Sequence, residues 1–235
     1  MKRGDFIFLL DQSSSIGGPK RFKLVKEFAK KVVDNFRVSD RIKMTINVGV
    51  ILYSNEAELK MELGKHDTFR KFVKALKNNV KFEGGTQTRI DRALILANKV
   101  FNGEGGDRPN VPNYIILMTD GKQNSGSYLI DSNLPNYARP LWDKNVTVLA
   151  VGVAEAQLEQ LRQLAGKTGK AIYRKRLEDL KYTVNELIPS ECSGKRVSSL
   201  NVRYIEGSNT SSSCSEVIRV VAVIVVIVVV AVVIL

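Results

Sequence analysis

The 235-residue sequence contains few cysteines, a single histidine and no nucleotide-binding motif, and each shortage excludes a class of site. Cys192 and Cys214 both follow the main domain, where they can close a short loop in an oxidising compartment, stay free or pair with another chain. His66 lies in a polar stretch far from the candidate loops described below, so we expect no Ser-His-Asp triad. Neither Gly-x-Gly-x-x-Gly nor the P-loop lysine pattern occurs, which argues against phosphate binding at Gly17-Gly18-Pro19.

Acidic residues are also in short supply, with 24 Asp and Glu against 36 Lys and Arg and a formal net charge of +12. Such an excess favours approach by anionic partners, whether acidic proteins, sulfated polysaccharide or nucleic acid, and does not choose among them. Hydrophobic residues make up 44% and charged residues 26%, which is ordinary for a globular protein. The length suits one α/β domain of roughly 180–200 residues plus a tail.

No secretory signal is visible at the N-terminus. Met1-Lys2-Arg3 resembles the basic start of one, but Phe6 to Leu10 is too short an apolar run and Asp11 follows at once. We interpret residues 6–10 as a buried strand and expect that an extracellular protein of this sequence would have a truncated N-terminus here. Arg3-Gly4-Asp5 spells an integrin-recognition tripeptide, which we interpret as a chance match beside that strand.

Short apolar runs alternate with amphipathic helical patterns, the signature of βαβ units. The sequence predicts an α/β fold: a doubly wound, mostly parallel six-stranded sheet flanked by helices, with one antiparallel strand and a C-terminal apolar tail. A long Gly/Ser-rich loop is expected over residues 122–136. The predicted strands are residues 5–10, 44–53, 56–63, 114–119, 146–153 and 170–174, and the predicted helices are residues 20–36, 67–77, 88–101, 155–165 and 177–188.

Three polar clusters follow predicted strands or precede a helix, where ligands bind in sheets of this kind. Asp11, Ser13 and Ser15 follow the first strand, Thr86 lies in Gly84-Gly85-Thr86-Gln87-Thr88, and Asp120 follows the strand ending at Thr119. All offer oxygen donors without sulfur or imidazole, so they suit Mg²⁺, Mn²⁺ or Ca²⁺ better than zinc. Because Ser13 and Ser15 alternate along the chain, their hydroxyls can point the same way.

These motifs resemble the metal-ion-dependent adhesion site of von Willebrand factor A domains, such as those of matrilins, fibril-associated collagens and integrin I domains. The resemblance covers about residues 4–190 and includes all three loops in order. It implies that Asp11, Ser13, Ser15, Thr86 and Asp120 hold one divalent cation, Mg²⁺ or else Mn²⁺ or Ca²⁺. It also implies that the final helix can shift when ligand binds. Thr88 is expected to support its loop by hydrogen bonding.

The expected function is non-enzymatic: capture, through the cation, of an Asp or Glu presented by an extracellular matrix or cell-surface protein. One alternative is a metal-independent polyanion surface that binds sulfated glycans. Under either function we expect no nucleic acid as partner. Another is a Mg²⁺-dependent phosphotransferase. Haloacid-dehalogenase-type enzymes place a second Asp two residues after the nucleophile, where this sequence has Ser13, which argues against that reading.

The C-terminal part differs in composition from the rest. Residues 220–235 are uninterruptedly apolar and follow a Ser-rich stretch. As a helix this run would span about 24 Å, short of the roughly 30 Å hydrocarbon core. We expect a von Willebrand factor A domain over residues 1–190, a juxtamembrane linker over 191–216 and a hydrophobic tail over 217–235. Three interpretations of the tail stay open: a GPI-anchor signal, a membrane span or an aberrant C-terminus. The expected location is extracellular, at the cell surface or in the matrix.

Overall fold

The computed structural model describes residues 3–37, 39, 42–121 and 133–187. Within them lies one six-stranded sheet in the order β3-β2-β1-β4-β5-β6, and every neighbouring pair is parallel except β2 and β3. The predicted doubly wound, mostly parallel fold is therefore confirmed. The strands are β1 (Gly4–Asp11), β2 (Ile46–Tyr53), β3 (Ala57–Met61), β4 (Asn113–Thr119), β5 (Thr147–Val153) and β6 (Lys170–Arg174).

Strand β1 occupies the centre of the sheet, and the chain winds outward from it in both directions. β2 pairs with one edge of β1 and β4 with the other, so the strand order reverses between β1 and β4. All eight residues of β1 are buried, which accounts for its nearly unbroken apolar sequence. The point of reversal at the carboxyl ends of β1 and β4 is where folds of this class form ligand sites.

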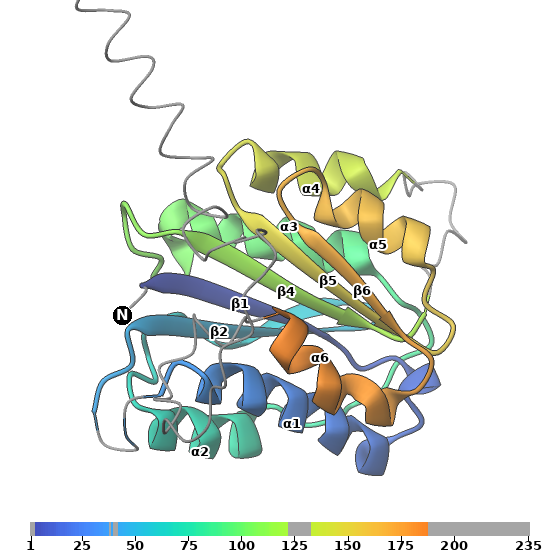
Figure 1. The fold of residues 1–235 in the computed structure, drawn as a ribbon, viewed down its shortest axis with the longest axis horizontal. Coiled ribbons are helices and arrows are strands. Elements are labelled where there is room, and N and C mark those ends of the chain that lie inside the picture. Colours follow the sequence, from blue (N-terminus) through green and yellow to red (C-terminus); the bar gives the residue numbers. More distant parts are fainter. Residues whose placement is uncertain (1–2, 38, 40–41, 122–132, 188–235) are drawn as a thin grey trace, which may run out of the picture.

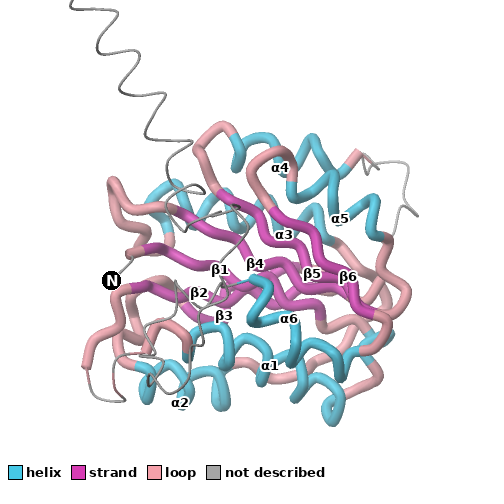
Figure 2. The backbone as a smooth tube through the Cα atoms, in the orientation of Figure 1, coloured by secondary structure: helices cyan, strands magenta, loops and turns pink. Residues whose placement is uncertain are grey.

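Helices cover both faces of the sheet (Figures 1 and 2). α1 (Pro19–Asp34), α2 (Phe69–Asn79) and α6 (Leu180–Leu187) lie on one face, and α3 (Ile90–Lys99), α4 (Leu134–Trp142) and α5 (Leu158–Ala165) lie on the other. Successive strand residues point to opposite faces, so Phe8 packs with the first layer and Ile7 and Leu9 pack with the second. The protein thus has one hydrophobic core on each side of the sheet.

The sequence of α1 shows why this segment is a helix and which side it buries. Gly18 has a positive φ of 89° at the N-cap, and Pro19 occupies the first turn, where its missing N–H costs nothing. The apolar stripe at helical spacing consists of Phe22, Val25, Phe28, Ala29, Val32 and Val33, all of them buried. Complete burial of one such large side chain contributes about 1.5–3 kcal/mol, so the stripe fixes α1 against the sheet.

One prediction about the second half of the chain needs correction. Residues 134–136, expected to end a loop, begin α4, a helix that was not predicted. Pro140 lies inside α4 and Pro135 at its start, and these helix breakers concealed the inward spacing of Leu134, Ala138 and Leu141. The rest of the expected loop, residues 122–132, lies outside the described residues. Elsewhere the predicted ends differ by up to three residues from the observed helices and strands.

Short helical turns account for two further differences. The predicted helix over residues 88–101 is α3 followed by a π-helical turn, Val100–Glu104. The predicted final helix begins with a 3₁₀ turn, Leu177–Asp179, which leads into α6. Its last predicted residue, Ile188, lies outside the described residues.

The remaining expectations concern the two ends of the chain. Gly4 and Asp5 are buried in β1, and Asp5 pairs with Arg108, so two of the three residues of the Arg-Gly-Asp sequence are part of the sheet. Cys192, Cys214, the linker over 191–216 and the tail over 217–235 lie outside the described residues. Among the helices that are described, none has the length and apolarity needed to cross a membrane.

Candidate metal centre

Asp11 is the last residue of β1, and its carboxylate is held at both oxygens. The side chain is fully buried. Its Oδ1 accepts a hydrogen bond from the Ser13 backbone N–H (2.8 Å), and its Oδ2 accepts one from the Thr119 hydroxyl (2.8 Å). Because Thr119 is the last residue of β4, the second bond joins the ends of the two central strands. The position of Asp11 is therefore fixed by the sheet.

The loop after β1 brings two hydroxyls to the same edge. After Ser13 the chain forms a 3₁₀ turn, Ser14–Ile16, and leaves it at Gly17 with a φ of 87°. The hydroxyl oxygens of Ser13 and Ser15 lie 2.8 Å apart, and the Ser15 hydroxyl donates to Asp120 Oδ1 at 2.9 Å. The two hydroxyls thus face each other, as their alternation in the sequence suggested, and they connect β1 to Asp120.

The glycine loop before α3 is tied to the loop after β1. The Gly85 carbonyl accepts from the Ser14 N–H at 2.8 Å. Gly85 has a φ of 156°, and a Cβ there would lie 2.2 Å from the Ser54 hydroxyl oxygen. That hydroxyl in turn donates to the Gly84 carbonyl at 3.0 Å. Only glycine allows the loop to approach the end of β2 this closely.

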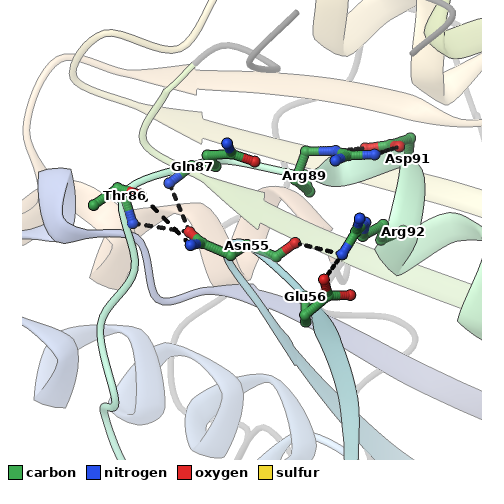
Figure 3. A network of polar contacts seen from close by, with 7 residues as sticks. All are labelled: Asn55, Glu56, Thr86, Gln87, Arg89, Asp91 and Arg92. Carbon is green, nitrogen blue, oxygen red and sulfur yellow. Dashed lines mark hydrogen bonds and ion pairs between the residues drawn. The ribbon is translucent and has the colours of Figure 1, made fainter. Parts of the chain in front are cut away.

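Asn55 binds the segment that contains Thr86 (Figure 3). Its Oδ1 accepts from the backbone N–H groups of Thr86 and Gln87, each at 2.9 Å, and its Nδ2 donates to the Thr86 hydroxyl at 3.5 Å. Arg92, in the first turn of α3, donates to the Asn55 carbonyl and pairs with Glu56. The turn after β2 is therefore clamped between the Thr86 loop and α3.

The structure joins four of the five predicted ligands directly. Hydrogen bonds connect Ser13, Ser15 and Asp120, and Ser13 is bonded to Asp11 through its backbone. Thr86 lies next to Gly85, which contacts the same loop, but Thr86 itself is exposed and its hydroxyl accepts a hydrogen bond from Asn55. Thr88 is buried.

Burial dominates the electrostatics of the two carboxyl groups. It raises the pKa of Asp11 to about 6, hydrogen bonds from Ser13 oppose the rise, and the nearby Asp120 adds to it. Burial likewise raises the pKa of Asp120, against the hydrogen bond from Ser15. The charge of Arg21 also lowers the pKa of Asp120, although within the described residues no Lys or Arg forms a direct ion pair with either carboxyl group. Two buried carboxylates without a paired cation would be stabilised by a bound metal ion.

The donor set also defines the kind of ion that fits. Carboxylate and hydroxyl oxygens are hard ligands of the sort Mg²⁺, Mn²⁺ and Ca²⁺ accept. In the described part of the chain no three His, Cys, Asp or Glu side chains gather at one place. The centre therefore offers two carboxylates supplemented by neutral hydroxyls. An ion held this way keeps much of its positive charge, which suits it to attract a further anion.

Three residues that support the centre were not singled out from the sequence. Thr119 holds Asp11, Asn55 holds the Thr86 loop, and the Gln12 side chain accepts from the Glu83 N–H at 3.0 Å. A usable signal existed for Asn55, because it follows β2, whose carboxyl end lies beside that of β1. For Gln12 and Thr119 the sequence shows polar residues at strand ends and gives no indication of their partners.

The sequence profile of the von Willebrand factor type A domain matches residues 5–188. The chain belongs to this family. It is 33% identical over 196 residues to the mouse collagen alpha-5(VI) chain and 34% identical over 163 residues to mouse matrilin-1. These matches cover 83% and 69% of this chain but 7% and 30% of the relatives, so the chain spans only a small part of either protein. The relatives are proteins of the extracellular matrix, which confirms the expected extracellular location.

Solved structures support the same assignment. Proximal thread matrix protein 1 from the mussel byssus superposes with a TM-score of 0.68 at 27% identity, covering 81% of this chain and 48% of that one. In a second structure of the mussel protein, zinc occupies the metal-ion-dependent adhesion site motif (TM-score 0.67, 28% identity). A von Willebrand factor type A protein from Catenulispora acidiphila, at 19% identity and a TM-score of 0.60, shares the fold. A divalent metal therefore binds in another member of this family at the adhesion-site motif that Asp11, Ser13, Ser15, Thr86 and Asp120 resemble.

Proposed function

We propose that this domain binds a protein partner in the extracellular matrix by capturing an Asp or Glu side chain through a divalent cation. Asp11, Ser13, Ser15, Thr86 and Asp120 hold the ion. The main support is the hydrogen-bonded group of Ser13, Ser15 and Asp120 beside buried Asp11, at the point where the strand order reverses. This group presents several oxygens to one spot. Within the described residues neither carboxylate forms a direct ion pair, and the charge of Arg21 acts only on Asp120 and from a longer distance.

Each residue contributes a distinct part of the binding. Asp11, fixed by Thr119 and the Ser13 backbone, supplies negative charge from the buried side, and Asp120 supplies it from the end of β4. The serine hydroxyls, now bonded to each other and to Asp120, turn their lone pairs to the ion without adding charge. When bound, the cation supplies an electrophilic position that a partner's carboxylate occupies. Ser15 and Thr86 are exposed, so the partner approaches from their side.

The role is structural recognition without catalysis. The relatives are structural matrix proteins, and Ser13 stands where a phosphotransferase of the haloacid-dehalogenase type would need its second aspartate. Mg²⁺ is the preferred ion on the chemistry of the donors, although the mussel protein accepts zinc. A phosphatase assay with Mg²⁺ should give no turnover above that of the Asp11→Ala variant.

The decisive experiment has two arms on the full chain. Calorimetric titration with Mn²⁺ or Mg²⁺ should show one site in the wild type. The control variant Asp143→Asn, which changes an exposed carboxylate at the C-terminal end of α4, should show the same site. Asp11→Ala should show none. In the second arm, capture of proteins from a solubilised matrix extract should require the metal and disappear with EDTA. Amidating the carboxyl groups of the extract beforehand should abolish it as well. Capture that persists in EDTA or with Asp11→Ala would refute the metal-dependent function.

A further inference from the structure

The positive charge of this protein is concentrated on one helical layer. α1 carries six Lys or Arg against two Asp or Glu, and α2 carries four against none. On the opposite face, α3, α4 and α5 together carry four against two. The excess behind the net charge of +12 therefore lies largely on the α1–α2 layer. α1 and α2 lie side by side along one side of the molecule (Figure 1).

The cations of α2 form a stripe along its exposed side. Arg70, Lys74 and Lys77 follow one another at i, i+4 and i+7, so they share one face over about 10 Å of helix. All three are exposed, and none has an acidic partner among the described residues. Lys71 alone is paired, with Asp67 before the helix. An uncompensated stripe of this kind leaves its charge available to a ligand.

α1 extends the stripe into a broader surface. Lys26 reaches across to the Val80 carbonyl just beyond α2, with a 3.0 Å hydrogen bond. Partial burial lowers the pKa of Lys26, the charge of neighbouring Lys23 lowers it further, and the charge of Glu27 opposes the shift. Lys23 is exposed and has no acidic partner among the described residues, and Lys81 continues the surface after α2. Lys26 thus lies at the C-terminal end of α2, and the cations of α1 continue from there alongside the α2 stripe. An extended polyanion could follow both helices.

We propose that this surface, formed by Lys23, Lys26, Arg70, Lys74, Lys77 and Lys81, binds a sulfated polysaccharide of the matrix. The extracellular location shared with the relatives places the domain among such chains. The binding is independent of the metal centre, because none of these residues takes part in the group around Asp11 and Asp120.

Two other polyanions fit the surface less well. Single-stranded nucleic acids are held by exposed aromatic rings on which bases stack, and the aromatic residues of α1 and α2 (Phe22, Phe28, Phe69 and Phe72) are all buried. The anionic lipids that attract basic surfaces lie mainly in the cytoplasmic leaflet, whereas the relatives of this domain are extracellular matrix proteins. Neither helix exposes a large apolar side chain that could insert into a membrane. What the surface offers is charge alone, which matches a linear chain of sulfate groups.

The test compares a charge reversal on this surface with an equal reversal elsewhere. In the full chain, Lys74→Glu/Lys77→Glu should weaken binding to heparin by about tenfold or more at physiological salt and lower the salt concentration of elution. The control Lys99→Glu/Lys167→Glu changes the net charge equally at exposed positions of the opposite layer, and it should change affinity less than about twofold. Circular dichroism should show both variants folded, because all four side chains are exposed.

Further arms separate this proposal from the metal-dependent function. Heparin binding should be unaffected by EDTA and by Asp11→Ala, whichever way the metal experiment turns out. Chemically desulfated heparin should bind poorly. The proposal would be overturned by equal losses in the two charge-reversed variants. Tighter binding to a DNA duplex or to phosphatidylserine vesicles than to heparin would overturn it too.

Discussion

The Ser15 hydroxyl donates a 2.9 Å hydrogen bond to Asp120 Oδ1, across 105 residues of sequence. Ser15 lies in the loop after β1, and Asp120 follows β4, the strand paired with β1. The bond shows how the sheet brings two loops together into one centre. Because Ser15 is exposed and Asp120 is buried, a substitution of Ser15 is the milder way to break this bond.

Ser15→Ala should weaken Mn²⁺ binding by about tenfold, because one neutral ligand is lost, with little effect on folding. The melting temperature of the metal-free protein should fall by only a few degrees, because Ser15 is exposed and water can replace its hydrogen bond to Asp120. Ser14→Ala is the matched control, an exposed serine in the same turn, and its affinity should stay unchanged. Calorimetric titration measures both, and equal affinities in the two variants would remove Ser15 from the ligand set.

Thr119→Val should lower the free energy of unfolding by about 1–3 kcal/mol, because Asp11 loses a buried hydrogen bond with no water to replace it. Thr183→Val is an instructive comparison. Thr183 is equally buried, on α6, and its hydroxyl has no hydrogen-bond partner among the described residues. We therefore expect Thr183→Val to be neutral or stabilising by up to about 1 kcal/mol. Urea denaturation of both variants without metal checks the contrast, and similar losses would show that the Thr119 bond contributes nothing.

Metal affinity should fall as the pH is lowered through 6. Burial raises the pKa of Asp11 to about 6, so protons compete with the cation below that pH. Mn²⁺ titration between about pH 5 and about pH 7.5 measures the change. A pH-independent affinity would contradict the assignment of Asp11 as a ligand.

The same group should affect the metal-free protein in the opposite sense. Its folded pKa of about 6 lies above the ordinary value of 3.8, so the folded state holds the Asp11 proton more tightly than the unfolded chain does. The contribution of Asp11 to stability is therefore fully present below about pH 3.8 and is lost as the pH rises to about 6. Urea denaturation of the wild type and Asp11→Asn over this range, with EDTA, isolates the contribution as the change in their difference.

Asn55→Ala should reduce Mn²⁺ affinity by about tenfold, because Asn55 orders the backbone of the Thr86 loop without touching the ion. Asn78→Ala, at an exposed position on α2, is the control and should behave as the wild type. If Asn55 only stabilises its turn, the melting temperature will fall while the affinity of the folded protein stays the same. That outcome would exclude a positioning role.

Arg108→Ala should destabilise the protein by about 3–5 kcal/mol, because it leaves the fully buried Asp5 carboxylate without its cation. Arg108 donates to Asp5 Oδ1 at 2.6 Å and 2.8 Å, and its backbone N–H donates to Oδ2 at 2.7 Å. Asp5 lies at the start of β1, the end opposite to Asp11, so Mn²⁺ affinity should not change. Urea denaturation and metal titration together test whether the two ends of β1 are independent.

Much of the fold was predictable because its signals are local. Uniform burial makes β1 an unbroken apolar run, and one-sided burial gives α1 a stripe at helical spacing, so each pattern can be read within a few turns. Helix α4 was not predicted because Pro140 breaks the local helical pattern. Packing of Leu134, Ala138 and Leu141 against the core stabilises the helix. Tertiary burial outweighed local propensity there.

The sequence by itself determined which oxygens are available: Asp11, Ser13, Ser15, Thr86 and Asp120 occupy strand ends and loops whatever the details of packing. Only the tertiary structure decided how they are held, through the Thr119 bond to Asp11, the Asn55 clamp on Thr86 and the alignment of α1 beside α2. The physical reason is the range of the interactions. Residue type and periodicity are properties of neighbours along the chain, whereas these contacts join segments that meet only when strands pair and helices pack on the sheet.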